Sequence, residues 1–470
     1  MTSPDPARRR FHMIRIGGTA MVPLAALLTE AGHRITGSDL DFYPPMSTLL
    51  ESLQVPVFRG FSADNLPADC DAVIVGNAAT RDNVEAVEAA RRGLPVLSLP
   101  QAIRQYLLPG RTSVVITGTH GKTTTSALTA WLLLDTGRDP SFLVGGEMRN
   151  LGRGYRSGSG PHFVLEGDEY NAAFFDRGPK FLHYEPRHLF IGNIEYDHAD
   201  LYPDLESIRE AFRRVAAIVP PEGVVVANRD DPTVVDVVAG ATARKVLVST
   251  EDLSADFAAA DIRFHPSGTD FTLVEAGTPT VRIASPLLGH HNVRNALGSI
   301  ALARGLGLSP AEIARALRRF AGVRRRLEVK GEKRGILVVD DFAHHPTAVR
   351  GTLQAARTRW PDRRIWALFE PRSNTAGRKI FESDYAEAFS AAGGLILAPV
   401  FHSNRLAPEA RIDRQALVLE FERSGKPAFA PEKLEEIPEY LRREARPGDV
   451  LLLMSSGAFG GLPETLLGIL

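Results

Sequence analysis

One segment, residues 113–134, constrains the fold of this chain more than any other. A hydrophobic strand predicted at Ser113–Thr117 runs into TGTHGKTTT, residues 117–125, and an apolar helix follows through Leu134. In such a loop, glycines let backbone N–H groups point at phosphate oxygens, and the helix N-terminus adds its positive dipole. The segment therefore predicts a parallel α/β sheet with a phosphate-binding loop at the carboxyl end of one strand.

The spacing within this loop is shorter than the usual G-x-x-x-x-G-K-[ST], because Ile116 stands where its first glycine would be. We expect Lys122 to reach the outer phosphates of ATP and the Thr123 hydroxyl to ligate Mg²⁺. The alternative is a chance glycine-rich turn. It is disfavoured because the strand, the lysine, three threonines and the helix all agree.

The length of 470 residues suggests about three domains. Strand and helix patterns alternate in three segments, 11–109, 110–321 and 322–470, after a polar, basic tail at 1–10 that we expect to be flexible. The predicted class is α/β, with a Rossmann-like N-terminal domain, a central phosphate-loop ATPase domain with a mostly parallel sheet, and a Rossmann-like C-terminal domain. Short alternating runs at 261–286 predict antiparallel hairpins in the central domain.

The composition excludes several functional classes. The formal net charge is −1, so the chain lacks the excess positive charge that typically binds nucleic acid or an anionic membrane surface. The single cysteine, Cys70, rules out an internal disulfide and fits a reducing compartment. We find neither a signal peptide nor a run of about twenty apolar residues, so we expect a cytoplasmic enzyme without membrane insertion.

Acidic and histidine residues follow two further predicted strands. Glu166 comes directly after one strand, with Asp168 and Glu169 as alternatives, and Asp197 and His198 follow the next strand. Because the carboxyl ends of parallel strands share one edge of the sheet, these groups could ligate a metal ion near the phosphates. The alternative for each carboxylate is a solvated charge in a loop, and for the histidine a structural role.

The start of the chain imitates a dinucleotide-binding fold. Gly17 and Gly18 end a predicted strand, and Asp39 follows about twenty residues later. The full G-x-G-x-x-G pattern is absent, and Arg15 stands where a first glycine is expected. Beside the stronger phosphate loop, this favours a nucleotide diphosphate over the redox cofactor of an NAD-dependent oxidoreductase. The alternative is a tight turn without a ligand.

The motifs together resemble the Mur ligases of peptidoglycan synthesis. Residues 117–125, the strand end at Glu166, Asn193–His198, the helix start at 291–296 and the stretch 340–346 fall in the family's order. The resemblance covers essentially the whole chain. It implies a first domain for a UDP-sugar, a central ATPase domain and a C-terminal domain that brings an amine. A folate polyglutamate ligase shares the short loop, but the diphosphate-like first domain argues against it.

The resemblance also assigns roles to individual residues. The ATP-binding positions would be Gly118, Thr119, His120, Gly121, Lys122, Thr123, Thr124, Asn292, Asn295 and Arg326. The UDP-sugar positions would be Gly17, Gly18, Thr19, Ser38, Asp39 and Asn77, and the peptide positions Arg372, Ser373 and Asn374. Metal ligands would be Thr123, Glu166 and His198, and catalytic residues Lys122, His198, Asp341 and His345.

Within the family, two stretches, DEY at 168–170 and EPRSNT at 370–375, most resemble one branch. That branch joins UDP-N-acetylmuramate to the murein tripeptide L-alanyl-γ-D-glutamyl-meso-diaminopimelate in peptidoglycan recycling. It uses ATP and Mg²⁺ and forms an acyl phosphate. The branch that adds L-alanine in biosynthesis is the alternative, a non-catalytic nucleotide-binding regulator is disfavoured, and a monomer is favoured.

Overall fold

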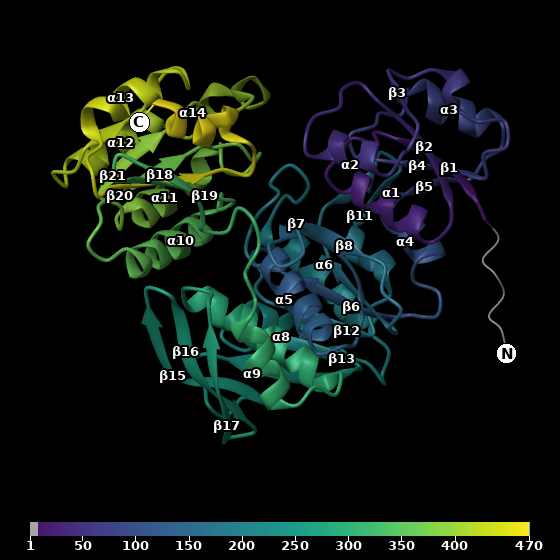
Figure 1. The fold of residues 1–470 in the computed structure, drawn as a ribbon, viewed down its shortest axis with the longest axis horizontal. Coiled ribbons are helices and arrows are strands. Elements are labelled where there is room, and N and C mark those ends of the chain that lie inside the picture. The colour runs from purple at the N-terminus through teal and green to yellow at the C-terminus, as the bar shows by residue number, and fades with distance from the viewer. Residues whose placement is uncertain (1–7, 470) are drawn as a thin grey trace.

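A computed structural model describes residues 8–469, and its three main sheets occupy separate parts of the molecule (Figure 1). The first strand begins at Arg10, inside the stretch predicted as a flexible tail, and residues 1–7 of that stretch lie outside the described residues. Among residues 8–469, no helix is long and apolar enough to cross a membrane. The predicted α/β class is confirmed.

The N-terminal sheet has five parallel strands in the order β3-β2-β1-β4-β5. Its strands are β1 (Arg10–Ile14), β2 (Arg34–Asp39), β3 (Val57–Arg59), β4 (Ala72–Val75) and β5 (Val96–Ser98). Its helices are α1 (Met21–Glu30), α2 (Met46–Ser52), α3 (Val84–Arg91) and α4 (Leu99–Tyr106). The turn from β1 into α1 therefore opens at the carboxyl edge of this sheet, where Rossmann-like folds bind ligands.

The central sheet has ten strands in the order β17-β16-β15-β14-β13-β12-β6-β9-β7-β8. The parallel strands are β6 (Thr112–Thr117), β7 (Ser141–Met148), β9 (His162–Glu166), β12 (His188–Ile191), β13 (Val224–Asn228) and β14 (Arg244–Ser249). At one edge, β8 (Arg153–Arg156) pairs antiparallel with β7. At the other edge, β15 (Phe257–His265) pairs parallel with β14 and forms the predicted antiparallel hairpins with β16 (Gly268–Glu275) and β17 (Thr278–Ser285). A separate hairpin joins β10 (Asn171–Ala173) and β11 (Asp176–Pro179).

Helices cover both faces of the central parallel strands. On one face lie α5 (Lys122–Asp135), α8 (His290–Gly305) and α9 (Pro310–Arg318), and on the other α6 (Leu205–Ala217) and α7 (Pro232–Val238). Val114 and Ile116 of β6 pack toward α5 and α8, whereas Val115 packs toward the other face. This is why β6 reads as a continuous apolar run, as strands buried on both faces do. The capping box predicted at Ser309 and Glu312 starts α9.

The C-terminal sheet has six strands in the order β18-β19-β23-β20-β21-β22, parallel except for β18. Its strands are β18 (Glu328–Lys333), β19 (Ile336–Asp341), β20 (Ile365–Phe369), β21 (Gly394–Leu397), β22 (Ala428–Phe429) and β23 (Val450–Met454). Its helices are α10 (Pro346–Arg359), α11 (Glu382–Phe389), α12 (Arg414–Glu422), α13 (Glu436–Glu444) and α14 (Leu462–Ile469). Figure 1 shows α10 on the side of this sheet that faces the central part.

Candidate functional site

The predicted phosphate loop lies between β6 and α5. Gly118 and Gly121 have φ values of 136° and 79°, which L side chains rarely adopt. A Cβ atom added to Gly121 would lie 2.5 Å from Oδ1 of Asn295, so the loop needs glycine there for the approach of α8 as well. Thr124 is buried under the loop at the start of α5. The sequence therefore folds into a close-packed turn whose helix N-terminus is free to face an anion.

Lys122 turns back over this loop. Its Nζ donates to the carbonyl oxygen of Gly118 at 2.8 Å and to the two carboxylate oxygens of Glu169 at 3.0 and 2.9 Å. Burial alone would lower the pKa of Lys122, but the Glu169 and Asp168 carboxylates raise it above its usual range. Lys122 is therefore held as an ammonium ion at the position predicted to meet the outer phosphates.

Thr123 and Glu166 meet beside the first turn of α5. The Thr123 hydroxyl donates to Glu166 Oε1 at 2.8 Å, and the backbone N–H of Gly145 donates to Oε2 at 2.6 Å. Burial and the nearby Asp168 charge raise the pKa of Glu166. A half-buried carboxylate beside a hydroxyl fits the oxygen ligands that Mg²⁺ prefers.

His198, the third predicted metal ligand, faces Glu169. Its Nε2 lies 3.1 Å from Glu169 Oε1. Burial would lower the pKa of His198, but the hydrogen bond to Glu169 and the charge of that carboxylate raise it. Glu169, predicted only as an alternative ligand, therefore links His198 to Lys122. Its place three residues after β9, near the edge of the sheet where the phosphate loop lies, was the signal in the sequence that favoured Glu169.

The amides of α8 lie next to the loop. Asn295 Nδ2 donates to Asn292 Oδ1 at 3.1 Å, and Asn292 Nδ2 donates to the carbonyl oxygen of Leu288 at 2.8 Å. The two side chains thus order each other, while Asn295 also packs against Gly121. The structure therefore brings two of the predicted ATP-binding positions, Asn292 and Asn295, to the edge of the loop.

The C-terminal part contributes Asp341 and Arg326. The buried Asp341 carboxylate accepts from the backbone N–H groups of Leu327 at 2.7 Å and Ala343 at 2.8 Å. Burial raises the pKa of Asp341, although Arg326 opposes this, and burial lowers the pKa of Arg326. The Arg326 guanidinium lies 5.0 Å from the ring centroid of Phe342. Asp341 therefore shapes the turn that presents Arg326, and its catalytic role stays a prediction.

His345 joins the C-terminal part to the phosphate loop. It precedes the first residue of α10, and its ring centroid lies 4.5 Å from that of His120. Glu195, which follows β12, lies between them: its Oε2 is 3.3 Å from His120 Nε2 and 3.4 Å from His345 Nδ1. The loop is fixed to this segment, since Thr119 Oγ1 accepts from the backbone N–H of Glu195 at 2.9 Å. Glu195 was not assigned a role from the sequence, although its strand-end position was a signal.

The predicted peptide-binding loop follows β20. The Arg372 guanidinium lies 3.6 Å from the ring centroid of Phe401. Ser373 Oγ accepts from the backbone N–H of Ala376 at 2.9 Å, and the backbone carbonyl of Asn374 accepts from Arg378. The next residue, Thr375, accepts a hydrogen bond from the backbone of Ala199 at 3.3 Å. This loop therefore lies beside the segment that carries His198.

The predicted UDP-sugar residues separate into two groups. Asp39 accepts from the backbone N–H of Gly17 at 3.0 Å and from Arg15 at 3.0 Å, so it closes the turn between β1 and α1. Ser38 is buried and donates to the carboxylate of Glu85, so its side chain faces the interior. Ser38 thus does not lie where the prediction placed it, because β2 turns it toward the buried Glu85. The exposed positions are Gly18, Thr19 and Asn77.

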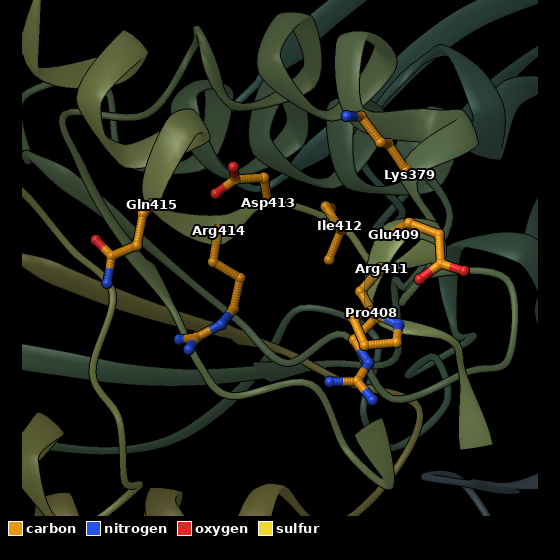
Figure 2. A pocket seen from close by; sticks show the side chains of 8 residues that line it. All are labelled: Lys379, Pro408, Glu409, Arg411, Ile412, Asp413, Arg414 and Gln415. Carbon is orange, nitrogen blue, oxygen red and sulfur yellow. The ribbon is translucent and has the colours of Figure 1, made fainter. Parts of the chain in front are cut away.

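A separate hollow on the C-terminal part involves none of these residues. Figure 2 shows side chains of both charges around it. The lining residues are Lys379, Pro408, Glu409, Arg411, Ile412, Asp413, Arg414 and Gln415. The candidate site is therefore the region where the phosphate loop, the ends of β9 and β12, and the N-terminus of α10 meet.

Comparison with protein-family models identifies the class. The model of the Mur ligase family catalytic domain matches residues 10–109, that of the Mur ligase middle domain 116–303, and that of the Mur ligase glutamate ligase domain 325–457. The chain belongs to the Mur ligase family, and it is an ATP-dependent ligase.

Two relatives and one solved structure show which members of the family this chain resembles. The chain is 37% identical over 462 residues to the UDP-N-acetylmuramate–L-alanyl-γ-D-glutamyl-meso-2,6-diaminoheptandioate ligase of Escherichia coli (strain K12), covering 97% of both chains. It is 35% identical to the UDP-N-acetylmuramate–L-alanine ligase of Desulfitobacterium hafniense (strain Y51), covering 95% of this chain and 96% of the relative. The crystal structure of a murein peptide ligase from Psychrobacter arcticus 273-4 matches with a TM-score of 0.74 and 32% identity, over 98% of each chain.

Proposed function

We propose that this enzyme joins the carboxylate of UDP-N-acetylmuramate to the free amine of L-alanyl-γ-D-glutamyl-meso-diaminopimelate, at the expense of ATP, in peptidoglycan recycling. The observation that carries the proposal is the full-length similarity to the E. coli ligase whose name states these substrates. The phosphate loop supports the use of ATP, because Lys122 lies over the loop and the Thr123 hydroxyl contacts Glu166 at the start of α5.

Activation of the carboxylate would come first, because a carboxylate is a poor electrophile. A carboxylate oxygen of UDP-N-acetylmuramate attacks the γ-phosphorus of ATP, the bond to the β-phosphate oxygen breaks, and ADP leaves. The Lys122 ammonium offsets the negative charge that builds up when these two anions approach. Two amides, Asn292 and Asn295, would hold the adenine, since amides offer both a donor and an acceptor.

Amide formation would follow on the acyl phosphate. The peptide amine attacks the carbonyl carbon, inorganic phosphate leaves, and the amine loses a proton. Closure of the C-terminal part over the central part would keep water from the acyl phosphate. Arg372, with the adjacent Ser373 and Asn374, would bind the peptide, because a guanidinium pairs well with carboxylates.

Mg²⁺ would be held by Thr123 and Glu166, with His198 as a further ligand, and would stabilise the charge on the transferred phosphoryl group. The UDP moiety would bind at the β1–α1 turn, on Gly17, Gly18, Thr19, Asp39 and Asn77. We assign these functions to three domains at 11–109, 110–321 and 322–470. The short gaps between α4 and β6 and between α9 and β18 support these boundaries.

The test is phosphate release from ATP in the presence of Mg²⁺ and UDP-N-acetylmuramate, with the tripeptide or L-alanine as acceptor. We expect turnover with the tripeptide and little with L-alanine. The second candidate is L-alanine addition, and the 35% identity to a relative of that name favours it. Preference for L-alanine would support this candidate, and no turnover with either acceptor would overturn both.

A further inference from the structure

Three side chains from distant parts of the sequence converge where the C-terminal part meets the phosphate loop. His120 comes from the loop, Glu195 from the segment after β12, and His345 from the start of α10. One ligand atom from each lies within 4.8 Å of the other two. The cluster therefore combines two imidazoles and one carboxylate at a single point.

The hydrogen bonds of His345 leave one of its nitrogens without a partner. Its side chain is only 5% exposed, and its Nε2 lies 3.3 Å from the backbone carbonyl oxygen of Tyr196, which can only accept. Nε2 therefore carries the proton, and Nδ1 presents a lone pair. Among residues 8–469, this buried Nδ1 has no hydrogen-bond partner, although Glu195 Oε2 lies 3.4 Å away. A buried lone pair beside a carboxylate is costly unless a cation lies between them.

The spacing within the cluster matches that of metal ligands. Zinc binds nitrogen and oxygen at about 2.0–2.1 Å in tetrahedral sites, so neighbouring ligand atoms lie about 3.3 Å apart. The two distances from Glu195 Oε2, 3.3 Å to His120 Nε2 and 3.4 Å to His345 Nδ1, agree with this value. His120 Nε2 and Glu195 Oε2 are also within hydrogen-bond geometry, whereas the contact between Glu195 Oε2 and His345 Nδ1 is short without that geometry. Two ligands of one ion point at the ion rather than at each other, which would account for the second contact.

Supporting contacts also follow the pattern of metal sites. A histidine ligand commonly donates its other N–H to a backbone carbonyl, as His345 does to Tyr196. Ligating carboxylates are themselves hydrogen-bonded, and the Thr347 hydroxyl donates to Glu195 Oε2 at 2.7 Å. Imidazoles suit zinc and similar transition metals, whereas Mg²⁺ prefers oxygen ligands.

We propose that His120, Glu195 and His345 form a binding site for a zinc-like divalent transition-metal ion. This site is separate from the proposed magnesium ligands Thr123, Glu166 and His198. Three protein ligands leave a fourth coordination position open. An ion here would tie the N-terminus of α10 to the phosphate loop and so hold the C-terminal part against the central part.

The test is Zn²⁺ binding by the full-length protein, first stripped of metal with a chelator and then kept in millimolar Mg²⁺. Competition with a chromogenic chelator gives stoichiometry and affinity. We expect one equivalent, and an affinity at least about tenfold lower in His120→Asn, Glu195→Gln and His345→Asn. A matched control is His265→Asn, which removes a histidine paired with only one carboxylate, Asp270. A second is Glu166→Gln, which removes a proposed magnesium ligand, and both should bind Zn²⁺ as the parent does.

Co²⁺ provides an independent readout, because a tetrahedral Co²⁺ site absorbs strongly in the visible range. We expect this absorption in the parent and its loss in the three cluster variants, each first checked for folding by circular dichroism. If one of the three cluster variants fails to fold, the loss of absorption is judged from the other two. The proposal is overturned if the parent binds no stoichiometric Zn²⁺, if the cluster variants bind it equally well, or if Glu166→Gln abolishes binding. None of these results depends on ligase turnover, so the proposed function is tested separately.

Discussion

Lys122 and Glu169 form a buried ion pair beside the phosphate loop, with the Lys122 Nζ 2.9 and 3.0 Å from the two Glu169 carboxylate oxygens. Only 11% of the lysine side chain and 3% of the glutamate side chain are exposed. Because Glu169 also faces His198, the same carboxylate orients a cation from the loop and an imidazole from the end of β12. The site is therefore pre-organised around Glu169.

Replacing Lys122 tests whether this ammonium serves the phosphates. We expect Lys122→Met to lower ATP-dependent turnover at least about a hundredfold, since it removes a positive charge aimed at the transferred group. It should also lower the free energy of unfolding by about 3 kcal/mol, because Glu169 loses a buried partner. Phosphate release and denaturant titration measure the two effects. The control is Lys245→Met, because this exposed lysine donates to backbone carbonyls after α7 and lies in no proposed site. If Lys122→Met kept the parent's turnover, Lys122 would have no role at the phosphates.

Removing the hydroxyl of Thr123 tests whether this side chain ligates Mg²⁺. The Thr123 hydroxyl touches Glu166 at 2.8 Å, so the two oxygens can share one ion. Thr123→Val should raise the Mg²⁺ concentration needed for half-maximal turnover about 10- to 100-fold, because it removes one oxygen ligand. Thr123→Ser keeps the hydroxyl and serves as the matched control, with a nearly unchanged requirement. Equal Mg²⁺ dependence in both variants would contradict this role.

The sequence predicted the parts of this site that are formed by neighbouring residues in the chain, and not the parts that depend on distant residues. The strand, glycines, lysine and helix of the phosphate loop are contiguous, so their geometry followed from local rules, and β6 and α5 appear where expected. The roles of the acidic residues were harder to predict. Glu166 ends β9 and Asp168 and Glu169 follow it, and only the turn of the chain decides which of the three faces Lys122. Ser38 shows the limit, since its orientation depends on Glu85, which lies 47 residues away.

Arg372 should act on the peptide and not on the nucleotide. Its guanidinium stacks on Phe401 and lies 3.5 Å from a carboxylate oxygen of Glu370, so it is held flat beside the loop that contacts Ala199. Arg372→Lys keeps the charge but loses the planar fork, and we expect the KM for the tripeptide to rise about tenfold with the KM for ATP unchanged. Arg282→Lys, at an exposed pair with Asp270, is the control. A parallel rise in both KM values would indicate a general structural role.

His188, at the start of β12, should make stability depend on pH. Burial, aided by the nearby His162, lowers the pKa of His188 to about 4 in the folded protein, whereas an unfolded histidine titrates near 6.5. Between these values the unfolded chain binds a proton that the folded chain does not, so stability falls as the pH falls. This contribution is fully present above about pH 6.5 and is lost progressively down to pH 4.

The measurement is urea unfolding at pH 7 and pH 5 for the parent and for His188→Gln. From pH 7 to 5 we expect the parent to lose about 2 kcal/mol more unfolding free energy than the variant, since each pH unit below 6.5 costs up to about 1.4 kcal/mol per titrating group. The carboxyl of Glu195, with a pKa lowered to about 2, adds its own loss only at lower pH. Leu189→Val, the next position in β12, should reduce stability by about 1 kcal/mol at both pH values, because it removes packing and no titrating group. If His188→Gln kept the parent's full pH dependence, the proton would be taken up elsewhere.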